Sequence, residues 1–313
     1  MPLRLRDRLE GGMLGLLVGD AVGVPYEFHS PLSLPPREQI DLVPPTGFRR
    51  AHPDTPVGTW SDDGAQALCL LASLLHCGRL DPADLGRRIA NWANVGYLAV
   101  DHRVFDIGNA TAEAIHRINE GASPETAGAT CVSSNGNGAL MRALPLALWH
   151  TGSDEELMID AMRQSRVTHR HLRSQLSCAI YCLWARYQLQ EQPDAWEAAV
   201  RVVGTLCESQ PEWQDELRTQ VLPAGAYPIR GTGYVVDCLH SSRAAVGATS
   251  YEGCIRDAIA LGHDTDTTAC VAGGIAGLIH GFSGIPNRWR EGLRGMEVAG
   301  PMIAELLRHR MAA

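Results

Sequence analysis

The chain has 313 residues, of which 45% are hydrophobic, and a formal net charge of −8 from 27 basic and 35 acidic residues. This length and apolar content are sufficient for one large domain or two. The basic residues form no stretch longer than pairs such as Arg87-Arg88, which argues against binding to a nucleic-acid backbone and favours a small ligand.

The sequence also bears on the compartment. Residues 1–23 resemble a secretory signal only faintly, because Glu10 and Asp20 interrupt the apolar stretch and no small-residue cleavage site follows. The longest uncharged apolar run, 269–279, is much shorter than the roughly 18 residues of a membrane-spanning helix. The nine cysteines are scattered and include no C-x-x-C pair. We therefore expect a reduced, cytoplasmic protein without a membrane span.

Apolar residues recur at helical spacing along most of the chain, as in the segments 65–75 and 172–183, and runs with the period of a strand are nearly absent. Typical helix boundaries separate these segments. Ser61 precedes one helix and Gly78 follows it, "LDPADL" opens the next, and Ser250 opens a later one. The pattern predicts an all-α protein of about a dozen helices.

Two segments are predicted to be irregular. Residues 30–58 contain seven of the 18 prolines, and residues 222–233 read "LPAGAYPIRGTG". Both segments mix turn-forming residues with apolar ones, so we expect loops that pack on the surface rather than flexible interdomain linkers.

The first acidic cluster is Ser61-Asp62-Asp63, directly before an apolar helical run. A serine at the N-cap with acidic residues in the first turn stabilises a helix by about 0.3 to 1 kcal/mol through the helix dipole, without any ligand. Taken alone, this cluster is explained well by capping.

The second cluster is "HDTDTT" at 263–268, in which Asp264 or Thr265 would cap a helix and Asp266 would lie in its first turn. Capping does not explain the glycines that follow, each of which costs about 0.5 to 1 kcal/mol inside a helix. Gly273 and Gly277, four residues apart, allow another helix to approach closely. We therefore expect this helix to be central and buried.

If the two clusters meet, four carboxylates share one small volume, and each like-charged pair at 4 Å repels by about 4 kcal/mol at an effective dielectric constant of 20. Such an arrangement requires cations, and carboxylate and hydroxyl oxygens suit Mg²⁺ or Mn²⁺. Two divalent ions would balance the four charges. An EF-hand is excluded, since its required glycine and glutamate positions are Ala269 and Ile275.

A third feature is "SSNGNGALMR" at 133–142, where two Asn-Gly pairs predict a tight turn. Its amides are able to bind phosphate if a helix begins there, with Arg142 one turn inside that helix. A plain connecting turn is the alternative. It is not a dinucleotide-binding motif, because Met141 replaces the third glycine.

Together, the motifs "GGMLGLLVGDAVGVPYEF", "TWSDDGAQALCLLASL", "SNGNGALMRALPLAL", "SRVTHRH", "GTGYVVDCLHSSRAAV" and "LGHDTDTTACVAGGIAGLIHG" resemble, in this order, the ADP-ribosylglycohydrolase family, related to dinitrogenase reductase-activating glycohydrolase. The resemblance covers residues 8–290. It implies a compact, all-α, orthogonal multi-helix bundle, forming a single domain over 1–313, with two Mg²⁺ or Mn²⁺ ions in a central cleft.

The resemblance also implies roles for individual residues. The implied metal ligands are Ser61, Asp62, Asp63, Asp264, Asp266 and Thr267. The implied substrate contacts are the loop Ser134, Asn135, Gly136, Asn137 and Gly138, around the ADP-ribose diphosphate, together with His169. The implied catalytic residues are Glu27, which would activate a water, and Asp62 or Asp106, which would assist the leaving group.

We therefore expect a monomeric, metal-dependent hydrolase that cleaves the bond between the distal ribose of ADP-ribose and an acceptor, such as an arginine side chain of a modified protein. Serine, an acetyl ester, a nucleic-acid end or a small antibiotic remain alternative acceptors. The alternative functions are a non-catalytic ADP-ribose-binding member, a metal-dependent phosphohydrolase suggested by His263-Asp264, and two capped helices with no site.

Two departures from the family pattern stand out. Gly64 replaces a frequent threonine, which leaves the preferred ion open, and His263 replaces a frequent glycine or asparagine. We interpret His263 as a loop residue.

Overall fold

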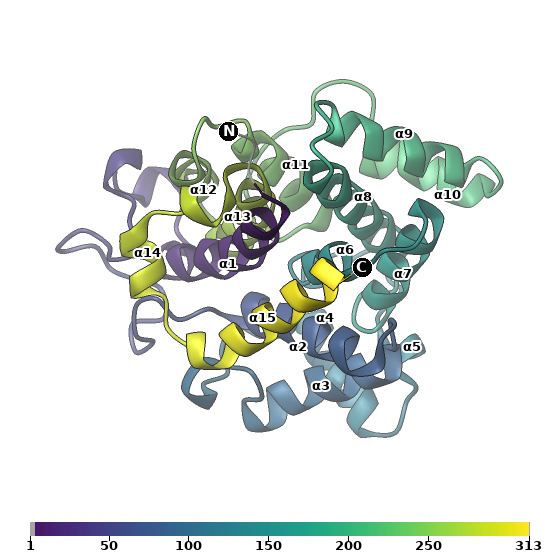
Figure 1. Cartoon of the computed structure of the whole chain (residues 1–313), viewed down its shortest axis with the longest axis horizontal. Coiled ribbons are helices and arrows are strands. Elements are labelled where there is room, and N and C mark those ends of the chain that lie inside the picture. The colour runs from purple at the N-terminus through teal and green to yellow at the C-terminus, as the bar shows by residue number, and fades with distance from the viewer. Residues whose placement is uncertain (1–3, 313) are drawn as a thin grey trace.

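The computed structural model describes residues 4–312, and Figure 1 shows helices joined by loops. Over this range no β-sheet forms, and only two isolated bridges occur. No helix among these residues is both long and apolar enough to cross a lipid bilayer. The α-helices are α1 (Leu5–Gly23), α2 (Asp62–Cys77), α3 (Pro82–Val95), α4 (Asn109–Asn119), α5 (Pro124–Ala127), α6 (Leu144–Trp149), α7 (Asp154–Arg166), α8 (Leu172–Leu189), α9 (Ala195–Cys207), α10 (Pro211–Glu216), α11 (Val235–Val246), α12 (Tyr251–Ala260), α13 (Thr265–Gly284), α14 (Asn287–Gly292) and α15 (Met296–Ala312).

The helices begin and end at the predicted signals. The Ser61 side chain caps α2, which ends at Gly78 in the left-handed conformation, with φ 64°. Asp81 caps α3, and Ser250 caps α12. The predicted all-α fold is confirmed, with 15 α-helices in the described residues where the sequence predicts about a dozen.

The centre of the molecule is the pair α1 and α13, which lie side by side (Figure 1). A Cβ atom added to Gly15 or Gly19 of α1 would overlap the backbone of α13, and one added to Gly273 or Gly277 would overlap the backbone of α1. The predicted close approach at Gly273 and Gly277 is confirmed, and the partner helix is α1. The glycine costs are offset by this contact between two helix backbones.

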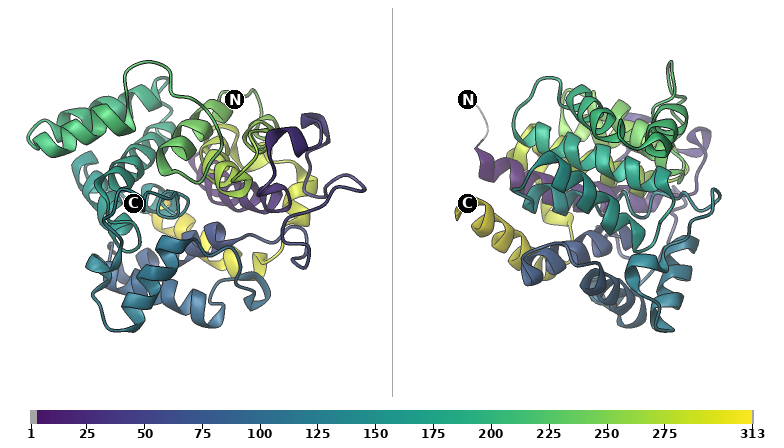
Figure 2. Two further views of the ribbon diagram at one scale, coloured as in Figure 1. Left: turned by 180° about the vertical axis from the view of Figure 1, so that it is seen from behind. Right: turned by 90° about the vertical axis from the view of Figure 1, so that its right-hand side faces the viewer.

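Other helices surround this pair. α11 and α12 pack on α13, and α15 packs against α1 and α2. Figure 2 shows the start of α1 and the end of α15 on the same side of the molecule. α2 contacts both α1 and α13, and a hydrogen bond between Thr267 and Asp63 joins the first turns of α13 and α2.

The two predicted irregular segments pack against the helices. In 30–58, Ile40 and Leu42 are buried, and the Trp289 indole donates to an Asp41 carboxylate oxygen at 2.6 Å. In 222–233, the Gly231 carbonyl accepts from the Asp264 N–H at 3.0 Å. The second segment therefore fixes the backbone at the start of α13.

Candidate active site

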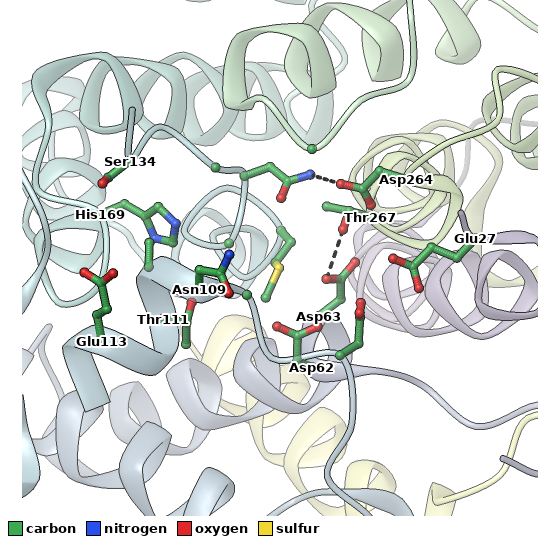
Figure 3. Close-up of a pocket in the computed structure, with 18 of the residues that line it drawn as sticks. Glu27, Asp62, Asp63, Asn109, Thr111, Glu113, Ser134, His169, Asp264 and Thr267 are labelled. Atoms are coloured by element: carbon green, nitrogen blue, oxygen red, sulfur yellow. Dashed lines mark hydrogen bonds between the residues drawn. The ribbon is translucent and has the colours of Figure 1, made fainter. Parts of the chain in front are cut away.

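A cleft of about 500 Å³ opens above the first turns of α2 and α13. In Figure 3, Glu27, Asp62, Asp63, Asp264 and Thr267 lie together at one end, and Ser134 and His169 lie at the other. The predicted site residues that line this cleft are Glu27, Asp62, Asp63, Asp106, Ser134, Gly136, Asn137, Gly138, His169, Asp264 and Thr267. The structure places Ser61, Asn135 and Asp266 beneath its surface, at 3%, 3% and 0% exposure.

The start of α2 holds its acids in place through a residue of α1. Both carboxylate oxygens of the buried Asp20 accept from the Ser61 N–H at 3.0 Å, and one accepts from the Gly64 N–H at 2.8 Å. The Ser61 hydroxyl accepts from the Asp63 N–H at 3.2 Å. A side chain at position 64 would collide with Trp60 and Leu17, which explains the glycine.

The start of α13 faces α2 directly. The Thr267 hydroxyl donates to the Asp63 carboxylate at 3.3 Å, the dashed line between these two residues in Figure 3, so the two acidic clusters meet as predicted. Of the two predicted caps, Asp264 or Thr265, the structure places Asp264 at the N-cap, without the side-chain hydrogen bond of a capping residue. The Asp264 Oδ2 atom accepts instead from the Asn137 amide at 2.8 Å.

Three carboxylate oxygens where α2 and α13 meet lack donors. Asp63 Oδ2 and both carboxylate oxygens of Asp266 are buried and have no hydrogen-bond partner. Burial raises the pKa values of Asp62, Asp63 and Asp266 well above their ordinary value, and the neighbouring carboxylates raise them further. Buried carboxylate oxygens without donors are costly unless a cation binds them, and divalent ions prefer such ligands. These residues therefore fit the divalent ions that the sequence implies.

Glu27 connects this acidic group to the cleft. Its carboxylate lies within 4.8 Å of Asp264 and Asp266 oxygens, a grouping able to hold a metal ion. On its other side, Glu27 Oε2 is 2.8 Å from His52 Nε2. Burial, and then Asp106 and Asp264, raise the pKa of Glu27 to about 11. Without cations Glu27 therefore holds a proton at neutral pH.

The Asn-Gly loop, residues 134–138, is not followed directly by a helix, which differs from the prediction. The next helix, α6, begins only at Leu144, so Arg142 lies in the preceding turn and the prediction of Arg142 one turn inside a helix is wrong. Pro145 explains the position of this start, because proline lacks an N–H and is favoured in a helix's first turn. Asn135 turns away from the cleft, donating to the Val132 carbonyl and accepting from the Ser174 hydroxyl, both at 2.9 Å.

His169 lies against this loop. Its Nδ1 atom is 2.8 Å from the Thr168 hydroxyl, and a Cβ at Gly138 would come within 2.9 Å of its Cε1 atom. Burial, and then Arg142, lower the pKa of His169 to about 3. The imidazole is therefore neutral and serves as a hydrogen-bonding group rather than as a charge.

The sequence reasoning missed several residues of the cleft or its support. Asp20 and His52 support the acids, and Asn109, Thr111 and Glu113 line the end near His169. Only Asp20 carried a signal in the sequence, because it is a charged residue inside an apolar helical segment. In the structure Asp20 is buried without a basic partner.

The phosphohydrolase alternative, suggested by His263-Asp264, requires further histidine ligands, and neither His76 nor His102 lines the cleft. His76 is exposed in the last turn of α2, and His102 is exposed at the end of a short 3-10 helix, Val100–His102. His263 is exposed, and its backbone N–H and carbonyl bond to His29 and Phe28. Among the metal-binding groupings found between residues 4 and 312, His52 is the one histidine.

Comparison with known proteins gives consistent matches. The family model described as ADP-ribosylglycohydrolase matches residues 1–312. The chain is 33% identical to "ADP-ribosylarginine hydrolase Tri1" of Pseudomonas putida over 93% of this chain and 75% of that protein. It is 28% identical to "ADP-ribosyl-[dinitrogen reductase] glycohydrolase" of Rhodospirillum rubrum over 91% and 90%. A solved "ADP-ribosylglycohydrolase-related protein complex" superposes with a TM-score of 0.76 at 29% identity, over 97% of this chain and 98% of that one.

Proposed function

The chain belongs to the ADP-ribosylglycohydrolase family, and from this premise we propose that it hydrolyses the bond between the distal ribose of ADP-ribose and an acceptor side chain. One observation carries the proposal: buried carboxylate oxygens of Asp63 in α2 and Asp266 in α13 lie beneath an open cleft without hydrogen-bond donors. A site of this kind suits metal-assisted hydrolysis of a sugar bond.

Two divalent ions, Mg²⁺ or Mn²⁺, would be held by Ser61, Asp62, Asp63, Asp264, Asp266 and Thr267. Bound there, they would orient the ribose hydroxyls, acidify a water and neutralise the repulsion among the carboxylates. The last effect matters for Glu27, because burial and then the neighbouring carboxylates hold its pKa high, and the ions would offset the second cause.

Glu27, with its pKa lowered in this way, would accept a proton from the attacking water, and His52 would hold its carboxylate in place. The water oxygen forms a bond to C1 of the ribose, and the bond from C1 to the acceptor breaks with its electron pair on the acceptor. Asp106 or Asp62 would assist this departure by supplying the proton that the acceptor takes up. Asp106 is suited to this role, since burial and then Asp264 raise its pKa to about 6.

The other end of the cleft would bind the diphosphate and the adenosine. We assign the diphosphate to the loop of Ser134, Gly136, Asn137 and Gly138, whose residues line the cleft, with neutral His169 beside it. Asn135 would support this loop from behind through its hydrogen bond with Ser174.

We propose arginine as the acceptor. Two relatives carry names that refer to ADP-ribosylarginine and to dinitrogen reductase. The acidic end of the cleft, with Glu27 and Asp106, complements a cationic guanidinium better than a neutral serine or an ester.

A panel of substrates tests the proposal. The protein is incubated in Mg²⁺ or Mn²⁺ with ADP-ribosylated arginine, ADP-ribosylated serine and O-acetyl-ADP-ribose, and free ADP-ribose is measured. We expect release from the arginine conjugate. Release of ADP-ribose only from another conjugate would show that arginine is not the acceptor. Binding of the conjugates without release of ADP-ribose would identify a non-catalytic member of the family.

Variants in the acidic group test the site. Asp264→Ala and Asp266→Ala should lower turnover by about 100-fold or more and reduce the bound metal. The matched control is Asp215→Ala, at an exposed acid of α10. Unchanged metal content in both variants would remove these residues from the site.

We further propose a monomer in a reducing, cytoplasmic compartment. All nine cysteines are free, and seven of them are buried. Size-exclusion chromatography with light scattering should give the mass of one chain, 33.9 kDa. A mass near twice this value would contradict the monomer.

A further inference from the structure

The cleft has an unbalanced charge. Its lining includes Glu27, Asp62, Asp63, Asp106, Glu113 and Asp264, but no arginine or lysine. The diphosphate of ADP-ribose adds two negative charges. Metal ions at the acidic end would balance the carboxylates there, but the diphosphate end has no cationic side chain on its surface.

A cation lies directly beneath that end. Arg142 is fully buried, at 0% exposure, and its hydrogen-bond partners among residues 4–312 include no carboxylate. Its hydrogen bonds go to neutral acceptors: the Gln164 side chain at 3.1 Å, the Gln164 carbonyl at 2.9 Å and the Gln66 side chain at 3.0 Å. A buried guanidinium is normally paired with an acid, and an unpaired one carries a large desolvation cost. Its positive charge therefore has no carboxylate in direct contact.

The remaining partners of Arg142 belong to the candidate site. Its Nη1 atom donates to the Gly138 carbonyl of the Asn-Gly loop at 3.1 Å and to the Thr168 hydroxyl at 2.8 Å. Thr168 in turn contacts His169 Nδ1 at 2.8 Å. The guanidinium therefore holds the Asn-Gly loop in place through the Gly138 carbonyl, and His169 in place through Thr168. Both groups line the diphosphate end of the cleft.

The same side chain reaches the acidic end through one intermediate. Gln66 accepts from Arg142 with its oxygen and donates to Asp62 Oδ2 with its amide at 3.0 Å. Burial lowers the pKa of Arg142 to about 10, which leaves it protonated at neutral pH.

We propose that Arg142 is the counter-charge for the substrate diphosphate, acting as a positioning residue through the Gly138 carbonyl, Thr168 and His169 without touching the substrate. This inference rests on the proposed function. It predicts that Arg142 serves ligands that carry a diphosphate and contributes little to the binding of a neutral ligand.

The test compares two ligands on matched variants. The affinities of ADP-ribose and of uncharged adenosine are measured by calorimetry or competition, together with kcat and KM for the arginine conjugate. Arg142→Met should weaken ADP-ribose binding and raise KM by about tenfold or more, while adenosine affinity and kcat change by less than about threefold. Arg142→Lys, which keeps the charge, should recover most of the ADP-ribose affinity.

A second variant, Gln164→Glu, neutralises the positive charge of Arg142 and leaves the arginine in place. Gln164→Glu places a carboxylate against the Arg142 Nε atom, so it should lower ADP-ribose affinity as Arg142→Met does, even if the latter fails to fold. Arg201→Met is the control for the loss of one positive charge, at an exposed arginine of α9 paired with Asp194.

The outcomes separate the two claims. If the wild type neither binds nor releases ADP-ribose, the proposed function fails and the role of Arg142 fails with it. If the wild type binds ADP-ribose and Gln164→Glu binds it equally well, only the role of Arg142 is wrong. Two further outcomes would overturn the role of Arg142. One is an equal loss of adenosine and ADP-ribose affinity in Arg142→Met, and the other is no recovery of ADP-ribose affinity in Arg142→Lys. Either result would show that Arg142 has a purely structural role.

Discussion

At the scale of single residues, the candidate site includes side chains that would hold the proposed reacting groups in place. Glu27 is buried, and His52 Nε2 contacts its carboxylate from a loop 25 residues later. His52 has a positive φ of 46°. Phe28 and Asp106, which lie beside it, also have positive φ angles, of 63° and 60°. Non-glycine residues in this conformation are rare and gather at functional sites.

The contact between His52 and Glu27 yields a first prediction. His52→Ala should lower kcat by about tenfold with little change in KM, because the base loses its orientation while the substrate contacts remain. His52→Gln, whose amide can replace the imidazole nitrogen, should recover part of the loss. The control is His76→Ala, at the exposed end of α2. A rise in KM with unchanged kcat would place His52 in substrate binding instead.

The buried aspartates yield a prediction on pH. Burial raises the pKa of Asp20 to about 7 and that of Asp106 to about 6, from ordinary values of 3.8. For an acid whose pKa is raised by folding, the stability it contributes is present below pH 4 and is lost as the pH rises through the folded pKa. The metal-free protein therefore loses this contribution between about pH 4 and pH 7.

Divalent ions should offset this loss, because they would bind the neighbouring Asp62, Asp63 and Asp266, whose pKa values burial also raises, and would bind them best once they are deprotonated. We expect the rise in Tm on adding Mg²⁺ to an EDTA-treated sample to be larger at pH 8 than at pH 5. Thermal unfolding followed by circular dichroism measures it. An equal rise in Tm at pH 5 and pH 8 would show that metal binding does not depend on the titration of these acids.

At the scale of elements, the contact of α1 with α13 sets the position of the acids. The glycines of the two helices bring the backbones together, and Asp20 near the end of α1 then caps the start of α2. Displacing α13 from α1 would therefore move Asp266 and Thr267 relative to Asp63.

This contact yields a third prediction. Gly277→Ala should destabilise the protein by about 1 to 3 kcal/mol, because its Cβ collides with the Gly11 carbonyl, and it should weaken metal binding. Gly204→Ala in α9 is the matched control, since nothing lies within 4 Å of its added Cβ; it should be neutral or stabilising by up to about 1 kcal/mol. Urea unfolding of both variants measures the difference. Equal effects would mean that the close approach contributes nothing.

At the scale of the whole molecule, the sequence predicted features that depend on local chemistry. Ser61 and Gly78 bound α2 because capping and the left-handed conformation act within a few residues. The glycines at 273 and 277 predicted a close contact because only packing explains their cost. The meeting of the acids followed from the family resemblance, and the hydrogen bond from Thr267 to Asp63 agrees with it.

The features that were missed depend on distant partners. Asn135 turns from the cleft because Ser174, 39 residues away, binds its side chain. Asp264 does not cap α13 with its side chain because Asn137, 127 residues away, donates to it. His52 reaches Glu27 through an irregular loop without periodicity, so no pattern connects the two residues.

The central claim is that the acids of α2 and α13 hold divalent ions that the hydrolysis of ADP-ribosylated arginine requires. The most direct test is the rate at which free ADP-ribose is released from an ADP-ribosylated arginine peptide before chelation, after EDTA, and after Mg²⁺ or Mn²⁺ is added back. We predict release that EDTA abolishes and either ion restores in the wild type, with no restoration in Asp266→Asn. Release that persists unchanged in EDTA, or no release under any of these conditions, would contradict the claim.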